Sequence, residues 1–215
     1  WFRTPCYDGA GMLLNEQEDY YSDPLAYYTA CIQRLKDKGA VFKTWHDILD
    51  GNCGQAKYEV LLQYDMDGGP RSMERIFSIL ESMNVRASIM IHRECHDWYA
   101  YAVEDLNLEY LQKAEKSGWA IGYHNNSIGN AQRIERAGDY GDAVLNEARE
   151  RFREDVLLLR KWFNIRTFTH HGGNALNKLT PVPQDLDIVC TDRLNQPLWK
   201  TIRSSFSDGG FMVRP

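Results

Sequence analysis

The chain has 215 residues, of which 43% are hydrophobic and 26% are charged, and its net charge is −5. This length and composition suit one globular domain, or one domain with an extension, and provide enough residues for a hydrophobic core. The acidic balance, without any run rich in Lys and Arg, argues against a nucleic-acid partner. No apolar stretch reaches the roughly 20 residues of a membrane-spanning helix, so we expect no transmembrane segment.

The cysteines favour a reducing compartment. They are Cys6, Cys31, Cys53, Cys95 and Cys190. Their odd number and wide spacing, without a Cys-x-x-Cys pair, argue against a disulfide framework or a zinc knuckle. Together with the lack of a visible secretory signal, this favours the cytoplasm. Because the chain begins with Trp1 and not with methionine, it is also compatible with a fragment that has lost a leader.

The beginning of the chain combines an irregular segment with a helix. Residues 1–21 lack periodicity and predict an irregular lead-in, and we expect one barrel domain over residues 22–215. Asp23-Pro24 is typical of a helix start, and apolar residues then recur at helical spacing until Gly39. A short extended piece over 41–45 and a turn near Asp50-Gly51 follow.

Four apolar runs come next, and each ends at an aspartate or a histidine. The runs and the residues after them are 58–64 with Asp65 and Asp67, 87–91 with His92, 119–123 with His124, and 165–169 with His170 and His171. Between and after them, the pattern predicts helices over 72–83, 106–116 and 140–163, a polar loop over 125–138 and a short apolar run over 186–190. This alternation predicts an α/β fold with parallel strands, in a sheet or a barrel. The carboxyl ends of such strands face one crevice, so we expect these side chains to converge there.

Asp65 and Asp67 form the first candidate pair. At i and i+2 on a regular strand, both carboxylates project to the same side, and two charges so close raise one another's pKa unless a cation lies between them. A divalent metal resolves this conflict, with one carboxylate as its ligand and the other as a base. A solvated acidic turn explains the same residues equally well.

Histidines supply the other candidate ligands. His124 ends a strand, where it could also cap a turn. Adjacent His170 and His171 point to opposite faces, so only one reaches a shared ion; we favour His171, because the glycines after it permit close backbone approach, and His170 remains a competitor. Imidazole and carboxylate together favour Zn²⁺ or another first-row metal.

Other side chains near the strand ends are candidates for substrate contact. His92 is a candidate proton donor, whereas His96 fits a surface loop. The aromatic rings of Tyr64 and Trp98 could stack on sugars, although packing explains such rings equally well. His170 and Asn174, in the His-His-Gly-Gly-Asn loop, are further candidates for substrate binding.

These motifs resemble those of a known family. Residues 64–70, Tyr-Asp-Met-Asp-Gly-Gly-Pro, resemble the Asp-Asp-Gly-Pro or Asp-Val-Asp signature of polysaccharide deacetylases, the NodB-homology superfamily of carbohydrate esterase family 4. Residues 84–89 are similar to its Val-Lys-Ala-Thr-Phe segment, and residues 116–124 to its Gly-His-Glu-Ile-Gly-x-His segment. The resemblance covers about residues 20 to 192, with specific motifs only at 64–70 and 118–124. It is closest to the divergent branch linked to surface-glycan synthesis.

The resemblance implies a fold and an activity. The fold would be a distorted (β/α) barrel, commonly with seven strands, and the chemistry would be hydrolysis of an N-acetyl or other N-acyl group on an amino sugar. Asp65 would be the catalytic base, and Asp67 and His124 would bind the metal. The substrate would be a carbohydrate; the oligomeric state does not follow from the resemblance.

The chain also departs from the family pattern. The second histidine of the His-x-x-x-His pair falls on Ile128, so His171 would substitute for it. The Arg-Pro motif after the fourth strand is replaced by the double histidine, and no histidine follows His171 to act as the late catalytic acid. Either His92 or another group serves as the acid, the domain continues past Pro215, or the domain is inactive.

Three functions are compatible with these motifs. The first is a metal-dependent N-deacetylase, and the second is an inactive deacetylase-like domain that binds glycan or a partner protein. The third is a barrel glycosidase that uses Asp65 with a distant acid; it would form reducing ends instead of acetate. The retained Asp65, Asp67 and His124 favour the first function.

Overall fold

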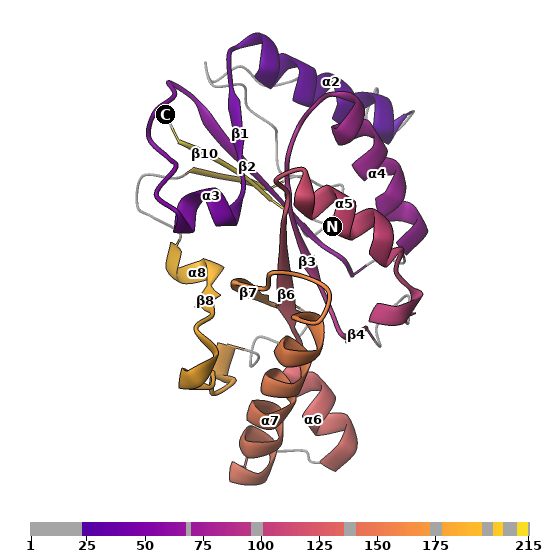
Figure 1. Cartoon of the computed structure of the whole chain (residues 1–215), viewed down its shortest axis with the longest axis vertical. Coiled ribbons are helices and arrows are strands. Elements are labelled where there is room, and N and C mark those ends of the chain that lie inside the picture. The colour runs from indigo at the N-terminus through magenta and orange to yellow at the C-terminus, as the bar shows by residue number, and fades with distance from the viewer. Residues whose placement is uncertain are drawn as a thin grey trace. The chain divides into compact units, whose positions relative to one another are not determined.

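The computed structural model describes residues 23–67, 70–95, 101–135, 141–172, 178–194, 200–203 and 210–214 (Figure 1). The chain divides into two compact units. Unit 1 comprises Trp1–Ser88 and Gln196–Pro215, and unit 2 comprises Ile89–Asn195. The expected lead-in over residues 1–21 lies outside the described residues.

The described residues of unit 1 form three helices and four strands. They are α2 (Pro24–Asp37), β1 (Val41–Lys43), α3 (Trp45–Leu49), β2 (Glu59–Asp65), α4 (Pro70–Ser82), β9 (Lys200–Arg203) and β10 (Gly210–Arg214). β1 lies parallel to β2, whereas β10 lies antiparallel to both β2 and β9. The expected start of α2 is confirmed: the Asp23 carboxylate accepts a hydrogen bond from the Ala26 N–H at 3.0 Å, with Pro24 at the first helical position.

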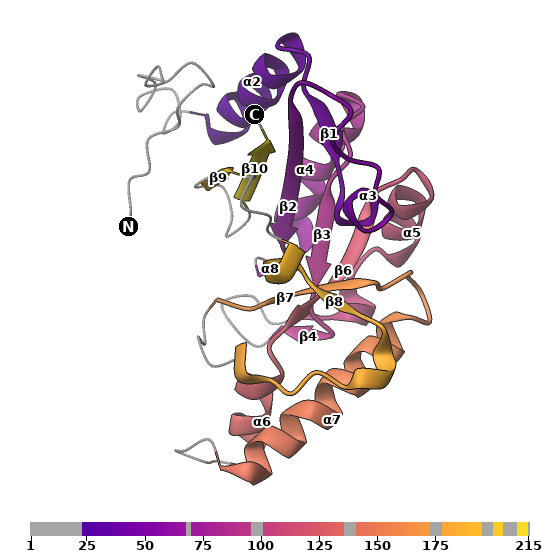
Figure 2. The same cartoon turned by 90° about the vertical axis from the view of Figure 1, so that its left-hand side faces the viewer.

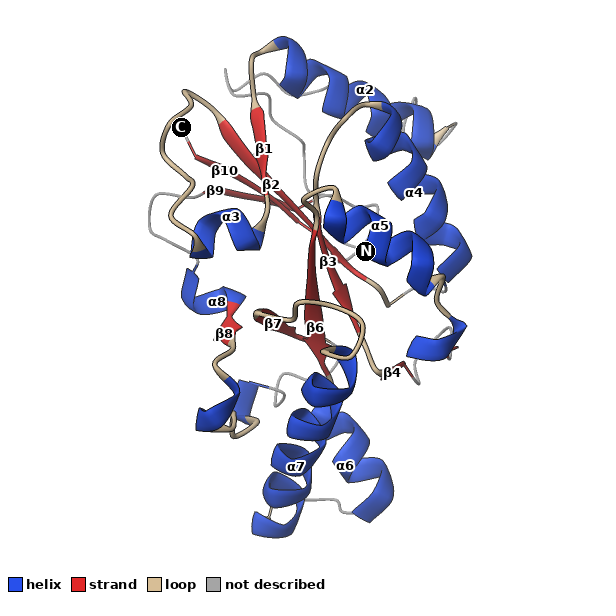
Figure 3. Ribbon diagram, in the orientation of Figure 1, coloured by secondary structure: helices blue, strands red, loops and turns tan. Residues whose placement is uncertain are grey.

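A chain of aromatic rings joins the helices of unit 1 to its sheet. The Tyr64 ring of β2 contacts Tyr28 of α2 and Phe77 of α4 edge-on, with ring centroids 6.4 and 6.1 Å apart. The hydroxyls of Tyr28 and Tyr64 also share a hydrogen bond. All three side chains are buried, so these rings form the centre of the unit 1 core, and edge-on contacts are favourable for aromatic pairs. Figure 3 shows α2 and α4 as blue helices and the strands in red.

Unit 2 alternates strands with helices. Its elements are β3 (Ser88–Ile91, which begins at the last residue of unit 1), β4 (Glu94–Cys95), β5 (Tyr101–Ala102), η1 (Val103–Asp105), α5 (Leu108–Lys116), β6 (Ala120–Asn125), α6 (Ser127–Glu135), α7 (Asp142–Leu159), β7 (Thr167–His170), η3 (Gln184–Leu186), β8 (Val189–Cys190) and α8 (Thr191–Leu194). β7 lies parallel to both β6 and β8. Helices α6 and α7 lie side by side in both views (Figures 1 and 2).

The α/β class is confirmed. The strand order in the main sheet is β8-β7-β6-β3-β2-β10-β9, with β1 also paired to β2. The pairs β1–β2 in unit 1 and β6–β7 and β7–β8 in unit 2 are parallel, as the expected α/β fold requires. The described residues do not confirm the expected barrel of seven parallel strands. No helix in the described segments combines the length and apolar content needed to cross a bilayer.

Two helices differ from the sequence-based expectation. The polar loop expected over 125–138 is wrong, because α6 occupies Ser127–Glu135. Its few apolar residues are spaced to face α7: Ile128 and Ala131 bury themselves against Val144 and Ala148. The short helix α3 was also not expected, although Thr44 and Asp47 cap each other's backbone N–H in a capping box. In both segments, polar residues near the helix start make the helical spacing of apolar residues difficult to recognise in the sequence.

A buried carboxylate supports unit 1. Glu59, at the start of β2, is fully buried, and its oxygens accept hydrogen bonds from the Gly54 N–H at 2.8 and 2.9 Å and from the Gln55 N–H at 3.2 Å. We expect Glu59→Gln to lower the free energy of unfolding by about 1.5–3 kcal/mol, because an amide replaces one acceptor oxygen with a donor that faces these N–H groups. Urea denaturation measures this change.

The matched control is Glu74→Gln, which makes the same change at an exposed position of α4. We expect it to change the unfolding free energy by less than about 0.5 kcal/mol. Equal denaturation midpoints for the Glu59 and Glu74 variants would show that the buried carboxylate adds nothing to stability.

Candidate metal centre

Three histidines of unit 2 lie close together at the carboxyl ends of its strands. His92 directly follows β3, His124 is the fifth residue of β6, and His171 directly follows β7. Their rings lie 4.5 Å (His92 to His124), 5.2 Å (His92 to His171) and 5.1 Å (His124 to His171) apart between centroids. Their exposed fractions are 1%, 1% and 7%. Three polar rings have thus been brought together away from solvent, although 79 positions of sequence separate the first from the last (171 − 92).

Strand pairing explains why His171, and not His170, joins this group. In the parallel pair β6–β7, His124 lies opposite Thr169 and Asn125 lies opposite His170. Residues opposite each other project to the same face and successive residues alternate, so His170 shares a face with Asn125. His171, two residues beyond Thr169, returns to the face of His124. Accordingly, the Nδ1 of His171 lies 3.2 Å from the Nε2 of His124.

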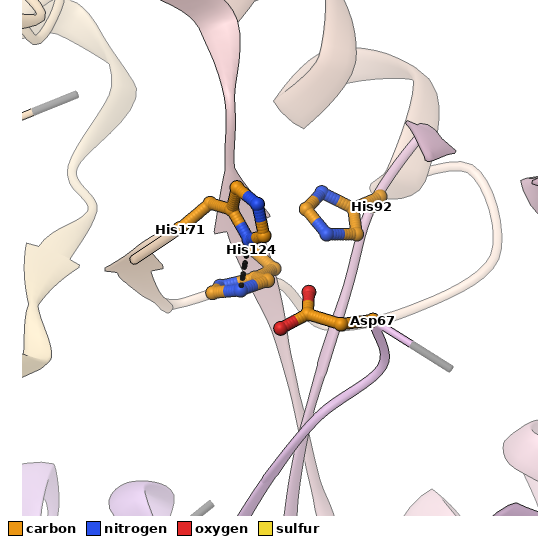
Figure 4. A group of neighbouring side chains, drawn as sticks. All are labelled: Asp67, His92, His124 and His171. Atoms are coloured by element: carbon orange, nitrogen blue, oxygen red, sulfur yellow. Dashed lines mark hydrogen bonds between the residues drawn. The ribbon is translucent and has the colours of Figure 1, made fainter. Parts of the chain in front are cut away.

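A carboxylate completes the group. One ligand atom from each of Asp67, His92, His124 and His171 lies within 4.8 Å of the others (Figure 4). Asp67 is half-buried, unlike the three histidines. Within the described residues, this is the one group of His, Cys, Asp or Glu side chains with such spacing.

The donor set fits a divalent transition metal. Imidazole nitrogen and carboxylate oxygen are ligands of Zn²⁺ and other first-row metals, with metal–nitrogen bonds of about 2.0–2.1 Å. Two nitrogens bound tetrahedrally at that distance lie about 3.3–3.4 Å apart, close to the 3.2 Å between His124 Nε2 and His171 Nδ1. Such a spacing suits either a shared proton or two lone pairs directed at one cation. A single ion can bind ligand atoms from more than two of these residues, whereas one proton joins only two of them.

Asn125 fixes the orientation of the double histidine. Its backbone carbonyl accepts a hydrogen bond from the His171 N–H at 2.9 Å, and its side-chain amide lies 3.1 Å from the Nδ1 of His170 and 3.2 Å from the Thr180 hydroxyl. Its Oδ1 accepts a hydrogen bond from the Ser127 N–H at 3.0 Å at the start of α6. Asn125 was not expected from the sequence as a site residue, although its position directly after His124 is the available signal.

Asp65 lies outside the four-residue group. It ends β2, is 9% exposed, and its carboxylate accepts a hydrogen bond from the Gln63 side chain at 2.9 Å. The expectation that Asp65 and Asp67 share one side assumed a regular strand. The strand stops at Asp65, and the Asp67 N–H donates to the Asp65 carbonyl at 2.9 Å, so the chain turns between them.

The residues expected to contact substrate have different surroundings. His170 is half-buried, and its ring packs edge-on against Phe168 with centroids 5.2 Å apart. Tyr64 is 3% exposed in the core of unit 1. Trp98, Asn174 and His96 lie outside the described residues. Substrate contact by these residues stays a prediction.

A hollow in unit 2 lies away from the histidines. It has a volume of about 760 Å³ and is lined by residues around the start of β7, including Arg160, Arg166 and Asp187. The histidines lie at the opposite ends of the strands. Arg160 already donates hydrogen bonds to the carbonyls of Ile165 and Leu186 at 3.1 and 2.7 Å, so we assign this hollow to the packing of the loops around it.

Comparisons of the chain with models of protein families, with curated proteins and with solved structures find no match.

The two adjacent histidines provide a matched test of the centre. We expect His171→Ala to lose most of the bound metal, because it removes a ring nitrogen from the group, and His170→Ala to keep it. Elemental analysis of the purified variants, after equilibration with Zn²⁺ and removal of the excess, measures the metal content per chain. Metal retained by His171→Ala, or lost from His170→Ala, would reverse this assignment.

Proposed function

We propose that this protein is a metal-dependent hydrolase that removes an N-acetyl or other N-acyl group from an amino sugar in a polysaccharide or a glycan precursor. The observation that carries the proposal is the group of Asp67, His92, His124 and His171, whose ligand atoms lie within 4.8 Å of one another. Two of these residues belong to the motifs that resemble polysaccharide deacetylases, at 64–70 and 118–124.

The metal role falls to three of the four residues. A catalytic site keeps at least one position open for water or substrate, so we assign Asp67, His124 and His171 as ligands and leave His92 for proton transfer. When bound, a divalent ion, expected to be Zn²⁺, supplies a Lewis acid that activates water and stabilises the oxyanion of the amide carbonyl.

The remaining residues transfer protons. Asp65, on the last position of β2, is the proposed general base that takes the proton of the attacking water. His92 is the proposed general acid that returns a proton to the leaving nitrogen, and residues 172–215 contain no histidine. Both residues lie at the carboxyl ends of their strands, where the active sites of such folds form.

An inactive glycan-binding domain is the alternative function, because the late catalytic histidine of the family has no counterpart between His171 and Pro215. It would retain carbohydrate binding without turnover. Cytoplasmic localisation stays a prediction from the cysteine pattern, as does the carbohydrate substrate itself.

Turnover and metal binding separate the proposed roles of the two aspartates. We expect the protein with Zn²⁺ to release acetate from N-acetylated amino-sugar oligomers, and a chelator to abolish this release reversibly. Asp65→Asn should reduce the rate at least about 100-fold while metal stays bound, since a general base contributes about 10²–10⁴-fold. Asp67→Asn, the same change two residues away, should lose the metal.

An enzymatic assay of acetate measures turnover, and elemental analysis measures the metal content of each variant. Sugar binding without acetate would favour the inactive domain, and new reducing ends would favour a glycosidase. Full activity of Asp65→Asn would refute its role as the base. For His92→Gln, retained metal with lost turnover supports proton transfer, whereas lost metal would make His92 a fourth ligand.

A further inference from the structure

Asp155 is a charged residue on the buried face of α7. It is 5% exposed, and it lies among the apolar residues by which this helix packs: Val144, Ala148, Phe152, Val156 and Leu159. Burying a carboxylate in such surroundings is unfavourable unless hydrogen bonds and an opposite charge compensate. A charged residue at a buried, apolar position of a helix therefore needs hydrogen-bond or ion-pair partners. In the sequence, Asp155 interrupts the row of apolar residues on this face of the helix.

Two partners hold the Asp155 carboxylate, one on each oxygen. The Tyr123 hydroxyl donates a hydrogen bond to Oδ2 at 2.8 Å, and the Arg93 guanidinium donates to Oδ1 at 3.2 Å. Burial raises the pKa of Asp155 to about 6, while the hydrogen bond from Tyr123 and the charge of Arg93 limit the rise. At neutral pH the carboxylate is therefore mostly ionised and forms a charge-assisted pair with Arg93.

The partners adjoin two of the candidate metal ligands. Arg93 directly follows His92, and Tyr123 directly precedes His124. The Tyr123 ring also packs edge-on against Phe152, one helical turn before Asp155, with centroids 5.2 Å apart. Its hydroxyl lies 3.0 Å from the Ser127 hydroxyl at the start of α6. One carboxylate on α7 thus joins the segments that carry His92 and His124.

We propose that Asp155 is a positioning residue, which acts through Arg93 and Tyr123 to hold His92 and His124 at the spacing that metal binding requires. The inference rests on the proposed metal centre and adds a residue to it. Mutation of residues that hydrogen-bond to metal ligands commonly lowers metal affinity by about 10–100-fold. Here the effect passes through residues adjacent to the ligands, because Asp155 does not belong to the ligand group.

The test compares Asp155→Asn with Glu154→Gln. Both remove one negative charge from neighbouring positions of α7, and the Glu154 carboxylate lies 3.9 Å from the same Arg93 guanidinium, but the Glu154 side chain is 69% exposed. Zn²⁺ affinity, measured by competition with a chromogenic chelator on the folded protein, should fall about 10–100-fold in Asp155→Asn. It should change less than about twofold in Glu154→Gln, because water screens an exposed charge.

Spectroscopy separates positioning from simple stabilisation. With Co²⁺ in place of Zn²⁺, we expect Asp155→Asn at saturating metal to alter the visible absorption, because the ligands have moved. Tyr123→Phe, which removes only the hydroxyl, should weaken Zn²⁺ binding in the same direction and serves if Asp155→Asn does not fold. The thermal unfolding of each metal-free variant is recorded in parallel.

Each outcome decides one claim. If Asp155→Asn and Tyr123→Phe are less thermostable but keep the Zn²⁺ affinity and Co²⁺ spectrum of the unaltered protein, Asp155 is only structural and the inference is wrong. If Glu154→Gln weakens binding as much as Asp155→Asn, general charge explains the effect and the inference again fails. If the unaltered protein binds neither metal, the proposed metal centre itself is refuted.

Discussion

The parallel pairing of β6 with β7 is the constraint on which the candidate centre depends. With His124 opposite Thr169, the alternation of side chains puts His171 on the face of His124 and puts His170 with Asn125. A shift of one residue in this pairing would exchange the two histidines. The backbone hydrogen bond from His171 to Asn125 fixes the same choice where the strand ends. Backbone geometry, more than the glycines that follow, selects the histidine that reaches the group.

The sequence predicted the strands of the sheet better than the helices packed around them. Apolar runs that end at aspartate or histidine identified β2, β3, β6 and β7, because buried parallel strands are continuously apolar. The start of α2 was also predictable, since Asp23-Pro24 is a local signal. Helix α6 was not, because its stability comes from Ile128 and Ala131 against α7, and such packing leaves only a weak trace in a polar segment.

The sequence predicted the residue types of the candidate site better than it predicted which individual residues belong to it. The sequence predicted Asp67, His124 and His171 as metal ligands from their places at the ends of apolar runs, whereas it gave His92, which belongs to the same group, only as a proton donor. Asp155 was missed because periodicity marks a position as buried without naming its partner. Its bonds to Arg93 and Tyr123 join residues 62 and 32 positions away, and no local pattern encodes such a pairing.

Buried charges in this chain have different consequences in the two units. Glu59 accepts hydrogen bonds from backbone N–H groups four and five residues before it, and its carboxylate lies 4.0 Å from the Lys43 ammonium on the neighbouring strand β1, so its partners all lie within unit 1. Asp155 instead binds side chains from two other segments, each next to a candidate ligand. Replacing a buried pair with apolar residues is often neutral for stability, so stability alone gives little reason for a carboxylate at this position of α7. A role in setting the distance between two candidate ligands gives that reason. The two oxygens of Asp155 bind Tyr123 and Arg93 separately, and these directional hydrogen bonds fix the positions of both residues more closely than apolar packing does.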